Sequence, residues 1–383
     1  MAVTLKAWGV DVGQSALKAV RLCGVEMGIA VDAFEIIEHV RPLSDPNANR
    51  DEVLADTLAR FAQRAERGGC HLAASVSALG GFSWWGRLPP MDGGAIPLTV
   101  RFEAQQQVPY PFEEAIWRWQ TFRDPDQPDA PDVDAGVFAL HREAVGRLLL
   151  LFSEAGINVD TMQMAPLAMY NVAAFERLLA REGATLLVDV GAGEVDVVLA
   201  EGRRLWVQAM GPGSSRLTQT VAASLGVDFA EADQRLRAVA DKADDPEAVA
   251  ALAPAAEELA EHVADLVIQY AREHSHLQPR LIVGAGQAVR LPGVLDALES
   301  KLQAPARAVG RFGRIEPSAA STPSAFVGNI PGLVVAYGLA LQELDLGTVH
   351  TDFRPPGIAR QWGWKKTGPL TRMMRGVRRL LGR

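Results

Sequence analysis

A short hairpin pattern occurs twice in the chain, about half a chain apart, and it limits the fold more than any other feature. Residues 8–22, WGVDVGQSALKAVRL, place an apolar run before Asp11 and a turn at Gly13, after which a second apolar run carries one lysine. Residues 186–199, LLVDVGAGEVDVVL, repeat the pattern with Asp189 in the place of Asp11. Each segment is typical of a β-hairpin whose tight turn points backbone N–H groups at an anion. The repeat predicts two related lobes that each present a turn to one cleft.

A third glycine-rich turn follows an apolar strand pattern at residues 281–286, LIVGAG. In a two-lobed arrangement, Gly284 and Gly286 would lie against the nucleoside of a bound nucleotide. The alternative is a dinucleotide-binding fingerprint, but Val289 occupies its third small position and no strand–helix–strand unit is expected before it. The nucleoside interpretation is therefore the better one.

The residue types in the two hairpins suit a nucleotide and a divalent cation. Asp11 and Asp189 could hold the water shell of Mg²⁺, which keeps its waters and meets phosphate oxygens. The backbone amides of Gly13–Ser15 and Gly191–Gly193 would face phosphates, and Lys18 could reach one as a point charge. The alternative is that each aspartate only caps its turn, as is common in Asp-x-Gly sequences. Two turns in the same strand context, with a third glycine-rich turn, favour the nucleotide site.

Length and composition narrow the class of protein. With 383 residues the chain is long enough for two lobes, and no apolar run approaches the ~20 residues that span a bilayer. Its two cysteines, Cys23 and Cys70, fit a reducing cytoplasm and exclude a disulfide framework. The net charge of −8 argues against a nucleic-acid-binding surface. A Walker A sequence, a Gly-x-Ser-x-Gly elbow and a Cys/His pair are all missing, so covalent catalysis has no candidate residue.

Hydrophobic patterning predicts further strands and helices between and after the hairpins. Alternation and aromatic content favour strands at 82–88 and 116–122, and helical spacing favours a helix at 97–107 between them. In the second half, we expect helices at 228–240 and 254–275 with an Asp/Ala-rich joint between them. The apolar segment IPGLVVAYGLALQE at 330–343 predicts a helix with small residues that can pack closely against a sheet.

The C-terminal residues 350–383 form a basic tail with nine Lys/Arg residues and one acid, Asp352. Helical spacing after Pro369 separates an apolar stripe from an arginine face. A helix of about 14 residues is marginal in water, so we expect it to fold on a membrane surface or a partner protein. A disordered solubilising tail is the alternative. The stripe consists of Leu370, Met373, Met374, Val377, Leu380 and Leu381, and the other face carries Arg372, Arg375 and Arg379.

Four segments in this order resemble the PilM family of type IV pilus assembly proteins, a branch of the actin-like class. They are the first hairpin (8–22), VRFEAQQQVPYPFEEAIW (100–117), GPGSSRLTQTVAASLGVDFAEAD (211–233) and LIVGAGQAVRLPGVLDALESKL (281–302). The likeness extends over nearly all of residues 6–345.

The resemblance implies an α/β, actin-like (ribonuclease H-like) fold with two lobes and a small inserted subdomain in the first lobe. The implied first lobe is 1–185, with the insert at about 33–150 and a completing helix at 330–345. The implied second lobe is 186–329, with a helical subdomain at about 214–275.

The resemblance also implies ATP and Mg²⁺ in the cleft, residence in the cytoplasm at the inner membrane, and pilus assembly proteins as partners. One partner would be an inner-membrane protein of PilN type, whose peptide lies in a groove of the first lobe near the insert. No catalytic residue is implied, so the protein is at most a slow ATPase. The nucleotide-binding positions carried over are Asp11, Gly13, Gln14, Ser15, Lys18, Asp189, Gly191, Gly193, Gly213, Gly284 and Gly286, with Asp11 and Asp189 holding Mg²⁺ through water.

This chain departs from the family pattern at the turns. Glu194 and Asp196 follow Gly193 where small hydroxyl residues are usual, and Gln14 replaces a small residue. Extra acids repel phosphates by like charge, so the departures predict weakened ATP binding. In addition, TDFRPP at 351–356 is similar to the PilN peptide and could fill its groove in cis or in a neighbouring molecule.

Two other functions fit parts of the sequence. An FtsA-like cell-division protein shares the actin-like fold and a C-terminal amphipathic membrane helix, and the tail favours it. A sugar-kinase-like phosphotransferase would need a catalytic carboxylate and a polar sugar pocket, and neither signature is found. The segment VPYPFEEA at 108–115 favours the PilM family.

Overall fold

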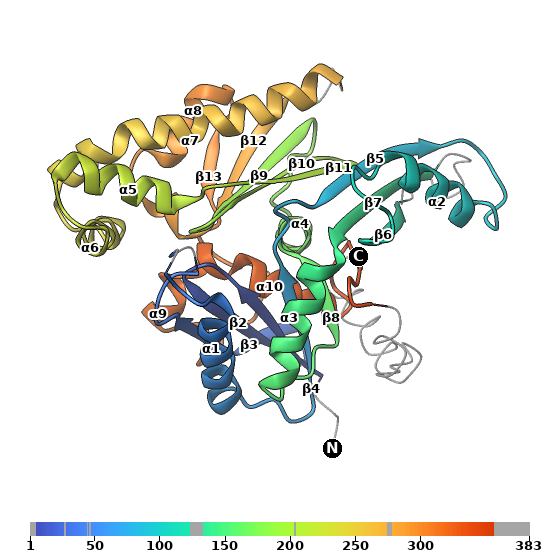
Figure 1. Ribbon diagram of the computed structural model, residues 1–383, viewed down its shortest axis with the longest axis horizontal. Helices are drawn as coiled ribbons and strands as arrows, with labels where there is room; N and C mark the ends of the chain where they lie inside the picture. Colours follow the sequence, from blue (N-terminus) through green and yellow to red (C-terminus); the bar gives the residue numbers. More distant parts are fainter. Residues whose placement is uncertain are drawn as a thin grey trace.

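Two five-stranded sheets and one three-stranded sheet form the scaffold of the protein. In Figure 1 the second five-stranded sheet and its helices lie above the first, and the small sheet extends to one side. The computed structural model describes residues 5–26, 28–43, 45, 47–122, 133–202, 204–273 and 278–355.

The first sheet has the strand order β3-β2-β1-β4-β8. Strands β1, β2 and β3 form an antiparallel meander, while β4 and β8 run parallel to β1. Trp8 of β1 packs edge-on against Phe61 of α1 at 5.5 Å, so this helix covers one face of the sheet. The strands are β1 (Lys6–Val12), β2 (Ala16–Val25), β3 (Gly28–Glu38), β4 (Cys70–Val76) and β8 (Thr161–Met164), and helices α1 (Arg50–Arg64) and α3 (Arg142–Glu154) lie side by side.

The second sheet repeats this topology, with the order β11-β10-β9-β12-β13. An antiparallel meander is again followed by two parallel strands, which is the relation that the repeated hairpin predicted. The predicted actin-like, two-lobed α/β fold is confirmed. The elements are β9 (Ala184–Val190), β10 (Val195–Glu201), β11 (Arg204–Met210), β12 (Pro279–Ala285), β13 (Ala306–Ala308), η1 (Gln287–Arg290), and helices α5 (Ser214–Leu225), α6 (Phe229–Ala240), α7 (Pro246–Glu273) and α8 (Val294–Leu302).

Helix α7 begins earlier than expected, because residues 246–253 belong to it rather than to a joint. Asp245 accepts a hydrogen bond from the amide of Ala248 at 3.0 Å, and Pro246 opens the helix. An aspartate followed by proline is a good helix start, and that signal outweighs Pro254, which lies inside the helix. Among the helices of the described ranges, none is long and apolar enough to cross a membrane.

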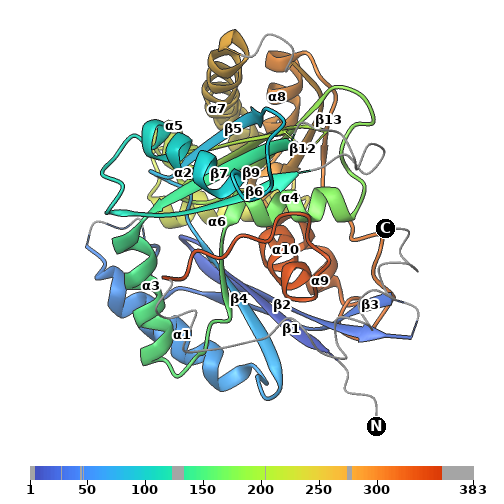
Figure 2. The same ribbon diagram turned by 90° about the vertical axis from the view of Figure 1, so that its right-hand side faces the viewer.

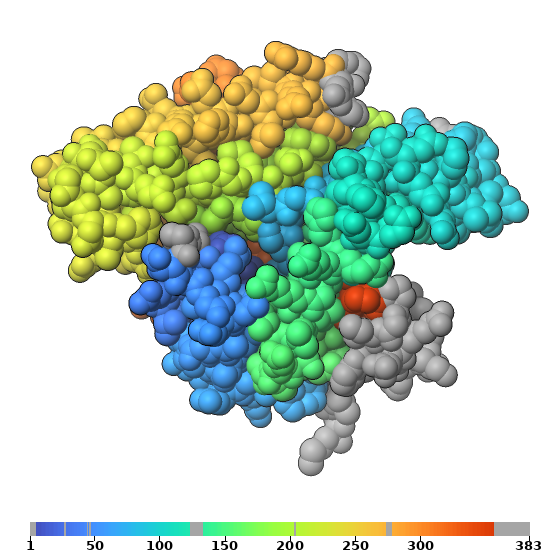
Figure 3. Space-filling view, viewed as in Figure 1, coloured from blue at the N-terminus to red at the C-terminus, as the bar shows by residue number. Residues whose placement is uncertain are grey.

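The inserted unit is the three-stranded sheet β5-β7-β6 with one helix. It projects from the side of the molecule, where its cyan and blue-green surface stands apart from the first lobe (Figure 3). The expected start near residue 33 is too early, because β3, α1 and β4 all belong to the first lobe. The elements of the insert are β5 (Phe82–Leu88), α2 (Ile96–Gln107), β6 (Ala115–Phe122) and β7 (Val133–His141).

Helix α10 (Val334–Glu343) is buried along its whole length between the first sheet and helix α4 (Ala165–Phe175). It lies directly on β1, because a Cβ atom at Gly9 would be only 1.9 Å from the carbonyl oxygen of Ala336. On its other side, a Cβ at Gly338 would be 2.0 Å from the oxygen of Ala168. Two glycines therefore allow the backbones of three elements to approach one another. Short α9 (Ser324–Val327) and η2 (Ile330–Leu333) precede this helix.

After α10 the chain forms an extended segment, residues 346–355, which we call the C-terminal strap. Figure 2 shows it in red, between the insert and the first lobe. The side chain of Asn171 on α4 accepts hydrogen bonds from the amides of Thr348 and Val349, both at 2.8 Å. Gln120 on β6 binds the strap from the side of the insert, through the amide of His350 at 2.9 Å.

The end of the strap lies along β8, the edge strand of the first sheet. The amide of Phe353 donates to the oxygen of Met162 at 2.7 Å, and the ring of Phe353 is fully buried. Residues 351–355, which belong to the TDFRPP segment, therefore lie on the first lobe beside the insert. The predicted amphipathic helix lies outside the described residues.

We expect Gly9→Ala to destabilise the protein by at least about 2 kcal/mol, since the new methyl group must push α10 off β1. Chemical denaturation followed by circular dichroism measures this change. Gly146→Ala in α3 is the matched control, because a Cβ there has no neighbour within 4 Å. It should stabilise the protein by about 0.5–1 kcal/mol. Equal effects of the two variants would contradict the packing argument.

Candidate functional site

The first turn presents a carboxylate and an ammonium group side by side. Asp11 and Lys18 are directly opposite each other in the β1–β2 hairpin, so their side chains share one face. Lys18 Nζ donates to Asp11 Oδ2 at 3.2 Å. The hydroxyl of Ser75, near the end of β4, donates to Asp11 Oδ1 at 2.9 Å and accepts a bond from the amide of Val12. Asp11 is thus fixed on both oxygens.

The second turn presents two carboxylates, because Asp189 and Asp196 are opposite each other in the β9–β10 hairpin. Burial raises the pKa of Asp189 to about 7; the ammonium of Lys18 opposes the shift, and the carboxylates of Asp11 and Glu194 add to it. Burial also raises the pKa of Asp196, and its Oδ1 has no hydrogen-bond partner among the described residues. The ionised forms of these two carboxyl groups are unfavourable, because burial removes the water that would stabilise their charge.

Helix α5 fastens the second turn to its own lobe. The amides of Ser214 and Ser215 donate to the oxygens of Gly191 and Ala192 at 2.8 and 2.9 Å. A Cβ at Gly213 would be 2.2 Å from the Gly191 oxygen, so only glycine permits this approach. The first amides of a helix have no acceptor within the helix. Here the backbone of the hairpin turn accepts hydrogen bonds from two of them.

The third turn closes over Asp189. Gly286 has φ of +83°, and a Cβ there would be 2.5 Å from Asp189 Oδ1. Its amide donates to the oxygen of Pro331 at 2.8 Å, which joins this turn to the segment before α10. Gly284 has another role: a Cβ there would meet the side chains of Leu295 and Val289, so this glycine leaves room for packing.

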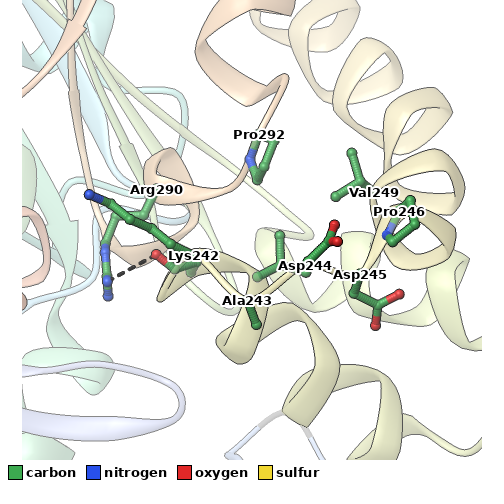
Figure 4. Close-up of a pocket in the computed structure, with 10 residues that line it drawn as sticks. Lys242, Ala243, Asp244, Asp245, Pro246, Val249, Arg290 and Pro292 are labelled. Atoms are coloured by element: carbon green, nitrogen blue, oxygen red, sulfur yellow. Dashed lines mark hydrogen bonds between the residues drawn. The ribbon is translucent and has the colours of Figure 1, made fainter.

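A cavity of about 660 Å³ lies beyond the third turn, between the end of α6, the start of α7 and η1 (Figure 4). Arg290 of η1 crosses to α6 and donates to the Ala240 oxygen at 3.1 Å and to the Asp241 carboxylate at 2.5 Å. The polar lining has both signs of charge. Its charged residues are Lys242, Asp244, Asp245 and Arg290, and Val249 and Pro292 add apolar surface.

Two contacts join the second turn to the first lobe. The side chain of Gln14 lies on Gly193, where a Cβ would be 2.2 Å from its Cγ. The hydroxyl of Ser77, just after β4, is hydrogen-bonded to Glu194 Oε2 at 2.5 Å. The structure therefore brings Gln14 and Glu194 to the same place, between the two predicted phosphate turns.

Asp11, Gln14, Lys18, Asp189 and Gly193 lie around this junction, and several other residues near it or at the cavity were not predicted from the sequence. Ser75, Ser77 and Arg290 were not assigned to it, nor was His39, whose Nε2 is 3.0 Å from the oxygen of Gly13 in the first turn. The two serines lie at the end of β4 and just after it, and strand β4 lies beside β1 only in the tertiary structure. Arg290 carried no signal, because its partner Asp241 is distant in sequence.

The residues fit a nucleotide in some respects and oppose it in others. The cavity offers space and Lys18 offers a cation. The first turn is tight, since a Cβ at Gly13 would be 3.0 Å from the Ala16 oxygen. Glu194 adds negative charge where phosphates would lie. Across the described ranges, no three His, Cys, Asp or Glu side chains are grouped so as to hold a metal ion. Magnesium would thus depend on Asp11 and Asp189 acting through water, together with the phosphates.

Comparison with known proteins finds one family model and many solved structures that match this chain. The family model described as type IV pilus assembly protein PilM matches residues 9–344. This match spans both five-stranded sheets, the insert and α10. No match was found among curated protein sequences.

Two of the matching solved structures illustrate the shared fold. The chain resembles a protein in the PilM-PilN type IV pilus biogenesis complex, with a TM-score of 0.72 and 21% identity over 88% of this chain and 98% of that one. It also resembles the ethanolamine utilization protein EutJ from Carboxydothermus hydrogenoformans, with a TM-score of 0.51 and 16% identity over 88% of this chain and 89% of that one. At these identities the likeness establishes the fold alone.

We expect Asp189→Asn to stabilise the protein at pH 8 by about 1–4 kcal/mol and to have almost no effect below pH 4. The carboxyl group has a higher pKa in the folded state than in the unfolded chain, so the wild type loses stability as the pH rises from about 4 to about 7. Denaturant titrations from pH 3.5 to pH 8.5 measure the difference.

Asp265→Asn, at an exposed position of α7, controls for the loss of one negative charge. Parallel stability curves for Asp189→Asn and the wild type would contradict a raised pKa at Asp189.

Proposed function

Because the chain belongs to the PilM family of type IV pilus assembly proteins, we propose that it is a cytoplasmic scaffold at the inner membrane that binds a PilN-like membrane protein and a nucleotide. The observation that carries this proposal is the family match over residues 9–344. It favours the PilM family over the FtsA-like and sugar-kinase-like alternatives. The scaffold would pass its nucleotide state to the pilus machine, or to a related type II secretion-like machine, rather than convert a metabolite.

A PilN-like partner is supported by the relative whose structure is a PilM-PilN complex. In this chain the region beside the insert has the features of a site for an extended peptide. Arg118 of β6 hydrogen-bonds the carbonyl oxygens of Asp352 and Arg354 in the strap, and Gln120 contacts the strap through both polar atoms of its amide. These contacts are directed at backbone atoms, which suits an extended chain.

We expect a peptide from the cytoplasmic end of a PilN-like protein of the same organism to bind the full chain saturably in fluorescence polarisation. A peptide of the same composition in scrambled order is the control. Equal signals from both peptides would contradict the assembly role.

Residues 350–383 add a second arm to this experiment. We propose that the basic tail contacts the membrane surface, since a basic amphipathic helix is attracted to anionic lipid. A chain that ends at Pro355 should lose co-sedimentation with anionic vesicles and keep its affinity for the peptide. Loss of peptide affinity with unchanged vesicle binding would assign the tail to the protein partner instead.

A nucleotide is supported by the cavity and the three turns that lie near one another. Arg290 and Lys242 would contact the nucleoside end, and Lys18 with the amides of Gln14 and Ser15 would bind phosphates, since the amide of Gly13 donates to the Ala16 oxygen. Asp11 and Asp189 would orient the waters of Mg²⁺, which neutralises phosphate charge when it is bound. The remaining carboxylates keep the expected affinity low.

We expect Val249→Trp to abolish the binding of a fluorescent ATP analogue, because the indole ring would fill the cavity at its α7 wall. Ala250→Trp is the matched control: it is the next residue of α7, exposed and outside the cavity lining. Titrations with Mg²⁺ and thermal melts of both variants separate loss of binding from loss of fold. Undiminished binding by Val249→Trp would show that the nucleotide does not occupy this cavity.

A further inference from the structure

Glu194 makes a contact between the lobes at the place where the two phosphate turns meet. It belongs to the second turn, yet its carboxylate is hydrogen-bonded to Ser77, which follows β4 of the first sheet. Gln14 makes the reverse contact, from the first turn onto Gly193 of the second. Each turn thus sends one side chain across to the other lobe.

The backbone of the second turn cannot provide an opening, because it is bonded to its own lobe. Two amides of α5 hold the oxygens of Gly191 and Ala192, and Gly213 lies against this backbone with no space for a Cβ. The side chains of Gln14 and Glu194 are free of such backbone constraints. An opening at the junction must therefore come from movement of these two side chains.

The junction holds more carboxyl groups than basic groups. Asp11 and Asp189 lie near Lys18, whose ammonium group is paired with Asp11. The carboxylate of Glu194 is close enough to Asp11, Asp189 and Asp196 for their charges to influence one another, and the guanidinium of Arg50 is the cation that acts on it. An entering polyphosphate would bring further negative charge to a group that holds an excess of carboxylates.

We propose that Glu194 is a gate for the nucleotide site: bonded to Ser77, it joins the lobes and excludes phosphate, and phosphates bind only after it has left Ser77. Gln14 completes the closure by covering Gly193. This proposal rests on the proposed nucleotide site and adds its control. Without nucleotide, the hydrogen bond between Glu194 and Ser77 holds the lobes together. On binding, the phosphates take the place of the Glu194 carboxylate between the lobes.

The test is a titration of the full-length chain with a fluorescent ATP analogue and Mg²⁺. Glu194→Gln and Glu194→Thr should raise the affinity at least about tenfold, because they remove the carboxylate charge. Ser77→Ala should raise it less, because it frees the carboxylate but keeps the charge. Thermal melts confirm that each variant is folded.

Glu38→Gln is the matched control. Glu38 of β3 forms a 2.7 Å ion pair with Arg237 of α6, so it also joins the lobes through a carboxylate, but away from the turns. Its affinity for the analogue should equal that of the wild type. An equal rise in Glu38→Gln and Glu194→Gln would overturn the gate, since any loss of interlobe contact would then suffice.

The outcomes separate the gate from the site itself. If the wild type and the Glu194 variants bind with equal affinity, and Val249→Trp removes this binding, the gate is wrong and the nucleotide site stands. If no variant binds the analogue, both the gate and the nucleotide site are overturned, and the peptide titration still decides the assembly role.

Discussion

The close packing of α10 between β1 and α4 is the constraint on which the rest of the structure depends. Gly9 and Gly338 let the helix approach both neighbours at backbone distance, and every residue of α10 is buried. On the far side, α4 packs against β9 and β10 of the second sheet. One hydrophobic core therefore extends from the first sheet through two helices to the second. Dispersion and apolar burial along this path hold the lobes in register.

The same helix carries functional segments at both of its ends. Before it, the oxygen of Pro331 binds the amide of Gly286, and Gln287 donates to Asn329 at 2.6 Å, so the third turn is placed relative to β1. After it, the strap ties the insert to the first lobe through Gln120 and Asn171. The candidate nucleotide site and the region proposed for the partner peptide are thus connected by one rigid element.

Much of the fold could be read from periodicity, since strong local patterns coincide with real elements. Strand β5 begins and ends at the predicted residues, and α2 differs from its prediction by one residue. One helix boundary was predicted wrongly because the weaker of two helix-start signals was followed. Pro254 was taken as a helix start, although Asp245 and Pro246 form a better one. The expected insert, at about 33–150, included too many residues. Strand pairing places β3 and β4 in the first sheet, and no local sequence pattern shows which strands pair.

The sequence by itself determined the two hairpins, the glycines that shape their turns and the acids that follow the second turn, because each depends on residues close together in the chain. Tertiary structure decided which groups meet. Ser77 and Glu194 are 117 positions apart, and their contact exists only because two lobes pack through α4 and α10. The elevated pKa of Asp189 also depends on tertiary structure, since the turn at Gly286 lies against its carboxylate and burial removes water from that group.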